Sequence, residues 1–390
     1  MATEAPLAHP EGLLLDEDGG FLYVADTGNG LVRRVELATN RIETIVGALG
    51  STLVPSPTPL PALDVDLVRP VGLALDRDVQ ELFVADAARG QVLVVDLASP
   101  SPSARVVLAL GFGFHPLRLA FHRFDGLRRL FVVDAGRFPG SSDAHRPELW
   151  MVDPGSGAFA NLPLNFGLYT SYRSLADIQL RPSGTGGASL FLAADIGERF
   201  ESFGGFPPFS PFDLQFEFDC FDGLDEDFDG LIDLADPDCE QVLQDVILSY
   251  DFNPDGSLVS ATPTVVVRGA RRFTIDVGQV PGCPQVIPDT PELDYPELVT
   301  AAFAMTSGGS FVCVDALNDE IARLDFEGPS PLTLFGTSFE LASTFDGASP
   351  LSTRLSRPRA LALDSLGNLY VADTIHNRVR RAWVGDLLGP

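Results

Sequence analysis

The sequence reads RPRALALD at residues 357–364, NLYVAD at 368–373 and NRVRRAWV at 377–384. Each of these segments is rich in Val, Leu, Ala and aromatic residues, and each is bounded by Gly, Pro, Asn or Asp. Short apolar runs between turn residues are typical of β-strands. The stretch therefore predicts three consecutive strands joined by tight turns.

The same triplet of segments recurs along the chain, which is the signature of a repeat architecture. Close copies read HPEGLLLD, FLYVAD and LVRRVEL (9–16, 21–26, 31–37) and RPVGLALD, ELFVAD and QVLVVDL (69–76, 81–86, 91–97). Less regular copies cover residues 115–153, 174–252 and 295–326. The chain therefore contains six copies of one unit.

A fourth short apolar segment follows the triplet in most copies, at 42–48, 104–112, 158–164, 262–269 and 331–336. Four short strands per unit, joined by tight turns, form one blade of a β-propeller. The sequence therefore predicts an all-β fold, a six-bladed β-propeller of four-stranded antiparallel blades. We expect residues 1–390 to form this single domain.

The last copy has three segments, after which the chain reads GDLLGP to its end. We therefore expect the closing blade to lack its outer strand, which gives 23 strands rather than 24. The exposed edge that results is a liability for pairing with other chains. We also expect the true start to lie upstream, or the domain to be excised from a longer protein.

The copies resemble NHL repeats, in which a Pro-x-Gly-Leu-Ala-Leu-Asp strand precedes a Gly-Asn-Leu-Tyr-Val-Ala-Asp strand and an Asn-Arg-Val-Arg-Arg strand. Residues 357–381 match this pattern almost letter for letter, and residues 9–37 and 69–97 match it closely. The resemblance covers the chain apart from one insert. It implies a six-bladed β-propeller.

An Asp ends the second segment of every copy, at Asp26, Asp86, Asp134, Asp195, Asp315 and Asp373. An Asp at a strand end accepts backbone N–H bonds from the turn that follows it. Since the residue recurs at equivalent places, we assign these carboxylates to the scaffold rather than to an active site.

The charge of the chain excludes several classes of partner. All 26 basic residues are Arg, and 54 acidic residues give a formal net charge of −28. Such a surface repels nucleic-acid phosphates and disfavours anionic membrane surfaces. We therefore expect no nucleic-acid partner, although some NHL propellers bind RNA through basic faces. No apolar run is long enough to span a bilayer, and MATEAPLAHP at the N-terminus has no signal-peptide pattern.

An insert over residues 199–243 interrupts the fourth copy, and it contains the sequence DEDFDGLIDLAD (225–236). This is the twelve-position pattern of a calcium loop, in which alternate carboxylates converge on one point and a Gly at position six permits the sharp turn. The predicted Ca²⁺ ligands are Asp225, Asp227, Asp229, the backbone carbonyl of Leu231, Asp233 and Asp236.

Two features of this loop indicate a structural calcium site. Position twelve is Asp236 rather than Glu, so we expect a weak dissociation constant of roughly 10⁻⁵–10⁻³ M. The flanks FDLQFEF and EQVLQDV do not read as two amphipathic helices that would open on binding. The loop resembles the Cys-bracketed, Asp-rich calcium loops of secreted bacterial proteins. The alternative is a solvated acidic loop that binds no ion.

Cys220 and Cys239 bracket the loop, and we predict a disulfide between them. Such a bridge would close about 20 residues and contribute roughly 3 kcal/mol, and it requires an oxidising compartment. The alternative is two reduced thiols. Cys283 and Cys313 either form a second bridge or stay separate. The Phe-rich residues 200–221 either pack the insert on the propeller or form an apolar patch for a partner.

Four residues are candidates for an ion site on the propeller axis. His9 and His115 stand before the proline that opens the first and third copies, and Glu11 and Glu297 follow the proline of the first and fifth. A solvated rim is the alternative. Propellers of this general type include zinc-dependent amidating lyases and gluconolactonase-like hydrolases, but that likeness is one of fold alone.

Repetition without a convergent catalytic set favours a non-enzymatic binding or scaffold propeller, and the sequence leaves catalysis undecided. We expect a secreted, periplasmic or cell-surface protein, monomeric or a module of a larger chain, whose insert is stabilised by calcium. Its ligand would be a protein, a small molecule or a glycan. Two alternatives stay open, a metal-dependent hydrolase or lyase with an axial site, and one module of an adhesive envelope protein.

The calcium site gives the first testable prediction. After chelation and calcium re-addition, the parent chain should retain bound metal and the Asp227→Ala/Asp229→Ala variant should retain none, because two of the carboxylate ligands are lost. Equilibrium dialysis against calcium, with the metal content of the protein solution compared with that of the dialysate, measures this directly. Metal that persists in the variant would place a second site elsewhere and favour an enzyme centred on the axis.

Overall fold

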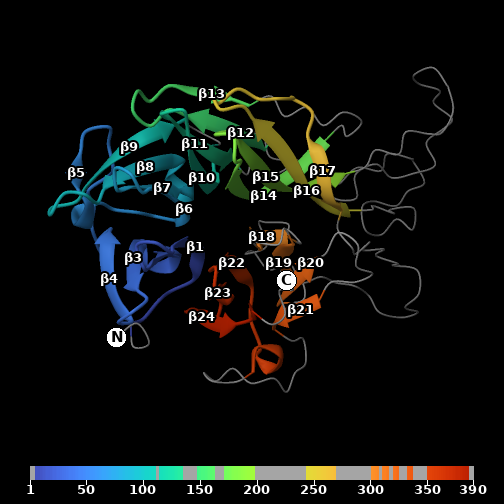
Figure 1. Cartoon of the computed structure of the whole chain (residues 1–390). Coiled ribbons are helices and arrows are strands. Elements are labelled where there is room, and N and C mark those ends of the chain that lie inside the picture. The colour runs from blue at the N-terminus through green and yellow to red at the C-terminus, as the bar shows by residue number, and fades with distance from the viewer. Residues whose placement is uncertain are drawn as a thin grey trace, which may run out of the picture.

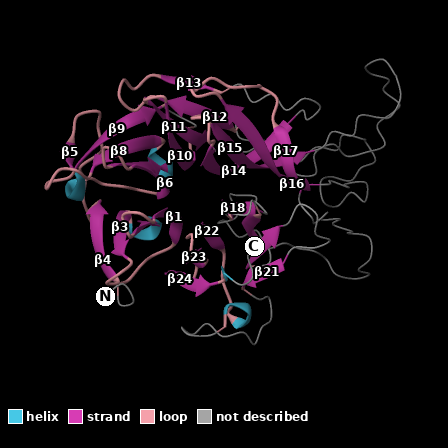
Figure 2. Ribbon diagram, in the orientation of Figure 1, coloured by secondary structure: helices cyan, strands magenta, loops and turns pink. Residues whose placement is uncertain are grey.

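The structure, a computed structural model, describes residues 5–110, 114–134, 147–162, 171–197, 243–268, 300–306, 310–315, 319–324, 332–336 and 349–385. Its strands form six antiparallel sheets arranged around one axis (Figure 1). The predicted six-bladed β-propeller is thereby confirmed. The helical elements of the described part are short 3₁₀ turns (Figure 2), η2 (Thr27–Asn29), η3 (Ala62–Asp64), η4 (Ala87–Arg89) and η7 (Pro350–Ser352). None of the helices in these ranges has the length and apolarity to cross a membrane.

The blades follow one another in chain order, and the first strand of each lies nearest the axis (Figure 1). Blade one contains β1 (Pro10–Asp16), β2 (Phe21–Asp26), β3 (Leu31–Glu36) and β4 (Arg41–Val46). Blade two contains β6 (Pro70–Asp76), β7 (Glu81–Asp86), β8 (Gln91–Asp96) and β9 (Ser103–Ala109), with β5 (Leu60–Pro61) beside β9. Blade three contains β10 (Pro116–Phe124), β11 (Leu127–Asp134), β12 (Glu148–Val152) and β13 (Phe159–Asn161).

The second half of the ring has the same order. Blade four contains β14 (Ser171–Pro182), β15 (Ala188–Gly197), β16 (Leu243–Phe252) and β17 (Thr264–Arg268). Blade five contains β18 (Thr300–Met305), β19 (Phe311–Asp315), β20 (Glu320–Leu324) and β21 (Leu332–Phe335). Blade six contains β22 (Pro358–Leu363), β23 (Asn368–Asp373) and β24 (Arg378–Trp383).

The closing blade has three strands among the described residues, as the sequence predicts. The described strands nevertheless number 24 rather than the expected 23, because Leu60 and Pro61 pair with Ala104 and Ser103 and add β5 to the edge of blade two. A two-residue strand in a connector has no apolar run of its own, so the repeat pattern does not reveal it.

The insert of blade four connects β15 to β16, two strands that pair with each other. β15 ends at Gly197, β16 begins at Leu243, and these two residues are register partners. The predicted calcium ligands Asp225, Asp227, Asp229, Leu231, Asp233 and Asp236, together with Cys220, Cys239, Cys283, Glu297 and the Phe-rich residues, lie outside the described residues. Cys313 is buried on β19 in the apolar cluster between blades four and five.

Apolar packing joins every blade to the next. Six clusters of buried side chains lie between neighbouring blades, and the sixth joins blade one to blade six through Leu22, Val24 and Tyr370. The ring therefore closes by face-to-face packing of sheets, although the described residues include no strand of blade one that pairs with blade six.

Proline opens four of the first strands and faces the repeated Asp. Pro10, Pro70, Pro116 and Pro358 are the register partners of Asp26, Asp86, Asp134 and Asp373, and the register shifts directly after each proline. The missing N–H therefore stands at the strand entry, beside a bulge, where no ladder bond is lost.

The repeated Asp residues hold the chain as it enters each blade. Asp26, Asp86, Asp134 and Asp373 are completely buried. Asp86 accepts the N–H groups of Val68 (3.0 Å) and Arg69 (2.9 Å), and the other three accept N–H groups from Ala8, His115 and Ser356 at 2.7–3.0 Å. Burial raises the pKa of Asp86 and the bound N–H groups oppose the shift. The scaffold role is confirmed for these four residues, although their backbone donors come from the segment before the blade rather than from the following turn. The side chains of Asp195 and Asp315 lie outside the described residues.

Hydroxyl groups form a second bond between neighbouring blades. Thr27 Oγ1 donates to the carbonyl of Pro70, which opens blade two, and Thr374 Oγ1 donates to the carbonyl of Pro10, which opens blade one, both at 2.7 Å. The N–H of His9 also donates to Asn377 Oδ1 at 2.8 Å. Blade six is therefore tied to blade one by the same bond that ties blade one to blade two.

The buried Asp predicts a stability effect. Asp86→Ala leaves the part-buried N–H groups of Val68 and Arg69 without their acceptor, and it should lower the free energy of unfolding by about 2–4 kcal/mol. Asp86→Asn keeps one acceptor oxygen and should cost clearly less. Urea unfolding of both variants beside the parent measures the difference. Equal losses in the two variants would show that the acceptor function is not what Asp86 contributes.

Candidate functional site

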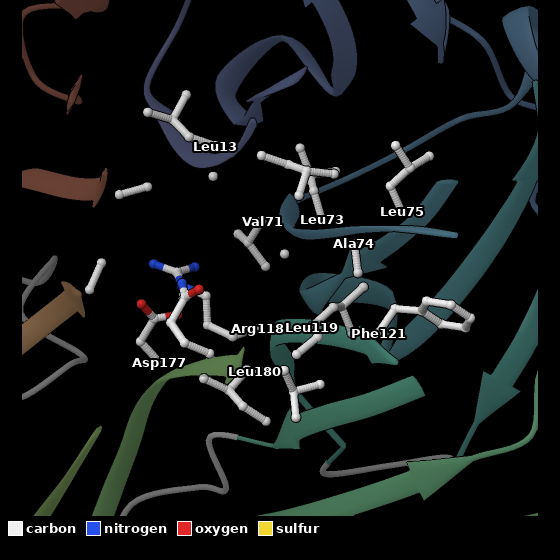
Figure 3. Close-up of a pocket in the computed structure, with 18 of the residues that line it drawn as sticks. Leu13, Val71, Leu73, Ala74, Leu75, Arg118, Leu119, Phe121, Asp177 and Leu180 are labelled. Carbon is white, nitrogen blue, oxygen red and sulfur yellow. Dashed lines mark ion pairs between the residues drawn. The ribbon is translucent and has the colours of Figure 1, made fainter. Parts of the chain in front are cut away.

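The first strands of the six blades enclose a pocket of about 210 Å³ on the axis (Figure 3). β1, β6, β10, β14, β18 and β22 all contribute to its wall. The lining side chains are mostly Leu, Val, Ala and Ile, and the charged ones are Arg118 and Asp177. The volume is below the roughly 300–1,000 Å³ that is typical for drug-sized ligands, so the pocket suits a small molecule.

Glycines in the repeat allow the first strands to lie close together at this level. A Cβ added to Gly12 would meet the Val71 carbonyl oxygen at 1.8 Å, and one added to Gly72 would meet the Leu117 carbonyl oxygen at 2.8 Å. Both distances are shorter than a carbon side chain permits, so the second position after the proline requires Gly in blades one and two. In blade three this position is Arg118.

Arg118 extends across the axis from β10. Its Nη2 donates to the carbonyl of Arg359 on β22 (2.8 Å), its Nη1 donates to the Leu117 carbonyl (3.2 Å), and its Nε lies 3.6 Å from Asp177 Oδ1. Burial lowers the pKa of Arg118, while the carboxylates of Asp177 and Glu11 oppose that shift. An arginine keeps its proton in proteins, so a positive charge is fixed inside the pocket.

Asp177 on β14 is the counter-charge. Its Oδ2 accepts the N–H of Phe303 on β18 at 2.8 Å, and its Oδ1 faces Arg118 (Figure 3). Burial raises the pKa of Asp177 to about 6, although the charge of Arg118 and the Phe303 N–H act in the opposite direction. Through this pair, strands of blades three, four, five and six are connected across the axis.

Three of the axial candidates from the sequence, His9, Glu11 and His115, lie outside this pocket wall. Glu11 binds Arg69 across the boundary of blades one and two, with Oε2 and Nη2 3.0 Å apart. His115 Nδ1 lies 3.3 Å from the Ala87 carbonyl, and the side chain of His9 is exposed. The described residues contain no cluster of three or more His, Cys, Asp or Glu side chains arranged for a metal ion. An axial ion held by these residues and Glu297 stays a prediction.

Sequence reasoning missed Arg118 and Asp177, although a signal for each of them exists. The second residue after the proline is Gly12, Gly72 and Ala360 in the most regular repeats, so Arg118 breaks the pattern at the position nearest the axis. Asp177 stands inside the apolar run SLADIQL, where a charge is out of place. Departures from a repeat thus mark the site better than the repeated residues do.

Comparison with known proteins agrees with the repeat pattern. No protein-family model matches the chain. A segment of 109 residues is 29% identical to NHL repeat-containing protein 2 of Bos taurus, and it covers 26% of this chain and 14% of that protein. The repeats in the sequence, the six blades of the structure and this partial match to an NHL-repeat protein all indicate the same kind of fold. The chain is a six-bladed β-propeller whose repeats are similar to NHL repeats. This propeller corresponds to a small part of the length of the bovine protein.

Solved structures share the fold of this propeller. An auxiliary nutrient binding protein from Bacteroides thetaiotaomicron superposes with a TM-score of 0.52 at 12% identity, over 96% of this chain and 69% of that chain. The protein of the same description from Bacteroides ovatus gives a TM-score of 0.51 at 12% identity, with the same coverage. Identities of this size show a common fold and nothing further.

The raised pKa of Asp177 predicts a pH dependence of stability. Between pH 3.8 and about 6 the folded state holds the Asp177 proton and the unfolded state releases it. The free energy of unfolding contributed by this group is therefore highest below that window, and it should fall by roughly 3 kcal/mol as pH rises through it. Asp177→Asn cannot titrate and serves as the reference.

Urea unfolding of the parent and of Asp177→Asn from pH 4 to 7.5 measures this contribution. The stability of the parent relative to the variant should decline up to about pH 6.5 and then stay level. A difference in stability between the two proteins that is constant across this range would show that the pKa of Asp177 is not raised in the folded state.

Proposed function

We propose that this propeller is a non-enzymatic binding protein that takes a small ligand in its axial pocket. One observation carries the proposal: six strands enclose a pocket lined mostly by aliphatic side chains, in which a buried guanidinium lies beside one carboxylate. Apolar walls with very few placed polar groups are characteristic of ligand sites. The apolar lining would hold the body of the ligand, and Arg118 would fix its orientation.

The hydrogen bonds of Arg118 leave donors for a ligand. A guanidinium has five N–H groups. Two of them donate to the carbonyls of Leu117 and Arg359, and the Nε faces Asp177. The two N–H groups that remain match a carboxylate or another acceptor, because the planar guanidinium binds such groups with two parallel bonds. We therefore infer that the ligand carries an anionic or strongly accepting group.

The fold relatives support a binding role. Two propellers of the same fold are described as auxiliary nutrient binding proteins. The proposal assigns the same kind of role, capture of a small nutrient molecule, to this chain. Secretion or display at the cell surface and a calcium-stabilised insert belong to the proposal on the strength of the sequence, through Cys220, Cys239 and the acids at 225–236.

Asp177 favours a second candidate, a hydrolase or lyase. A carboxyl group with a pKa of about 6 in a pocket is suited to general acid–base catalysis. Both oxygens of Asp177 are engaged, however, by the Phe303 N–H and by Arg118. Structural ion pairs perturb pKa values in the same way, so we place the binding role first.

Thermal unfolding in the presence of small ligands tests the two candidates. The parent is screened against monosaccharides, sugar acids and amino acids, and a true ligand at a hundred times its Kd should stabilise it by about 2.7 kcal/mol. Arg118→Lys should remove most of this gain, because an ammonium lacks the planar fork. Arg105→Lys is the matched control, since Arg105 donates to the Pro154 carbonyl away from the pocket.

Two results would contradict the proposal. Ligand stabilisation that survives Arg118→Lys unchanged would place binding outside the pocket. Turnover of lactones or esters by the parent, abolished in Asp177→Asn, would favour the enzyme.

A further inference from the structure

The outer edge of blade six differs from that of every other described blade. β24 is the last strand of a three-stranded sheet, whereas the other five sheets have four or five strands (Figure 1). A strand at a sheet edge presents backbone N–H and C=O groups that can pair with an added strand. The repeat symmetry of the propeller then indicates which chemistry that added strand would have.

β24 is the equivalent of β3 in blade one. Arg381 is the register partner of Tyr370, as Arg34 is of Tyr23. The preceding arginines are also equivalent, because Arg380 pairs with the repeated Asp373 and Arg33 with Asp26. Blade one therefore shows the environment that Arg381 would have beside a fourth strand.

In blade one the fourth strand supplies an acid to this arginine. Glu43 on β4 is the register partner of Arg34, and its Oε1 accepts from Arg34 Nε at 2.9 Å. In blade six the exposed Arg381 donates to Asn368 Oδ1 at 3.0 and 3.2 Å and lies 5.9 Å from the centre of the Tyr370 ring. Within the described part of the chain, no carboxylate pairs with Arg381.

Trp383 provides a second, apolar contact on the same face. It stands two residues after Arg381, so both side chains project from the same side of the strand. The indole is 55% exposed, and its Nε1 donates to the carbonyl of Leu366 at 3.0 Å, which holds the ring beside the edge. The residue at this position in β3 is Glu36, whose register partner on β4 is Arg41.

We propose that the edge of β24 binds an extended segment of another polypeptide, with an acidic residue opposite Arg381 and an apolar residue opposite Trp383. Backbone pairing would supply affinity, and the two side-chain contacts would supply specificity. A second copy of this chain is disfavoured as the partner, because β24 carries no acidic residue that could lie opposite Arg381 of the other copy. The site is independent of the axial pocket.

A peptide derived from β4 tests the proposal. The peptide TNLIETIVG has the sequence of residues 39–47 with Arg41→Leu, which sets Leu opposite Trp383 and Glu43 opposite Arg381. The chain has two Trp residues, so Trp150→Phe makes Trp383 the sole tryptophan, whose emission is excited selectively over that of the tyrosines. Addition of the peptide should give a saturable blue shift of Trp383 emission.

Exchanging the charges of the peptide and the protein tests whether the peptide residue at position 43 contacts Arg381. The same peptide with Glu43→Arg should bind about tenfold more weakly, since like charges opposite one another destabilise strand pairing. Arg381→Glu in the protein should reverse the preference and bind the Glu43→Arg peptide. Arg181→Glu, an exposed arginine on β14 in blade four, is the control of equal net charge and should leave the original preference intact.

Three results would overturn the proposal. One is the lack of any saturable change in Trp383 emission, which would show that the edge takes no strand. Another is equal binding of both peptides to the parent, which would show unspecific apolar contact. The third is a concentration-dependent dimer in sedimentation velocity that Arg381→Glu strengthens, which would make a second copy the partner.

Discussion

A buried carboxylate at the end of each second strand determines how the propeller is built. In the four blades where its side chain is described, it accepts N–H groups from the segment that enters the first strand of the same blade. A charge removed from water is tolerated only where hydrogen bonds replace its hydration. The entering segment must therefore come to the carboxylate, and that requirement fixes where each of these first strands begins and how it reaches the axis. Because the same hydrogen bonding recurs in these blades, their first strands all reach the axis, where the pocket lies.

Arg118 and Asp177 apply the same physical rule at a different place. Their charges are satisfied by backbone groups of other blades, Arg359 on one side and Phe303 on the other. A buried pair of this kind is weak evidence for stability, because desolvation offsets most of the attraction. What it does provide is a link between four blades, since each side chain bonds a backbone group of another blade. The pocket therefore combines apolar walls with one rigidly oriented positive group.

The fold was accessible from the sequence because each blade is encoded locally. Strand segments such as 368–373 carry both the apolar pattern and the Asp that ends the strand, and the repeats confirm one another. The axial pair was not accessible in this way, because Arg118 meets the Arg359 carbonyl 241 positions away, and no local pattern encodes that meeting. The strand β5 was missed for a related reason: Leu60 and Pro61 are a strand only because β9 lies beside them. The histidines chosen as axial candidates share a place in the repeat, yet His115 faces the Ala87 carbonyl and His9 faces solvent.

The register between β15 and β16 has a consequence for how this protein can change over time. Gly197 and Leu243 are partners at the end of a continuous ladder, so the two ends of the insert stay within strand-pairing distance whatever lies between them. The entropy of closing such a loop rises by only about 0.6 kcal/mol for each doubling of its length. Blade four can therefore accept inserted segments of very different length and composition between β15 and β16. Such changes should have little effect on the free energy of folding of the ring.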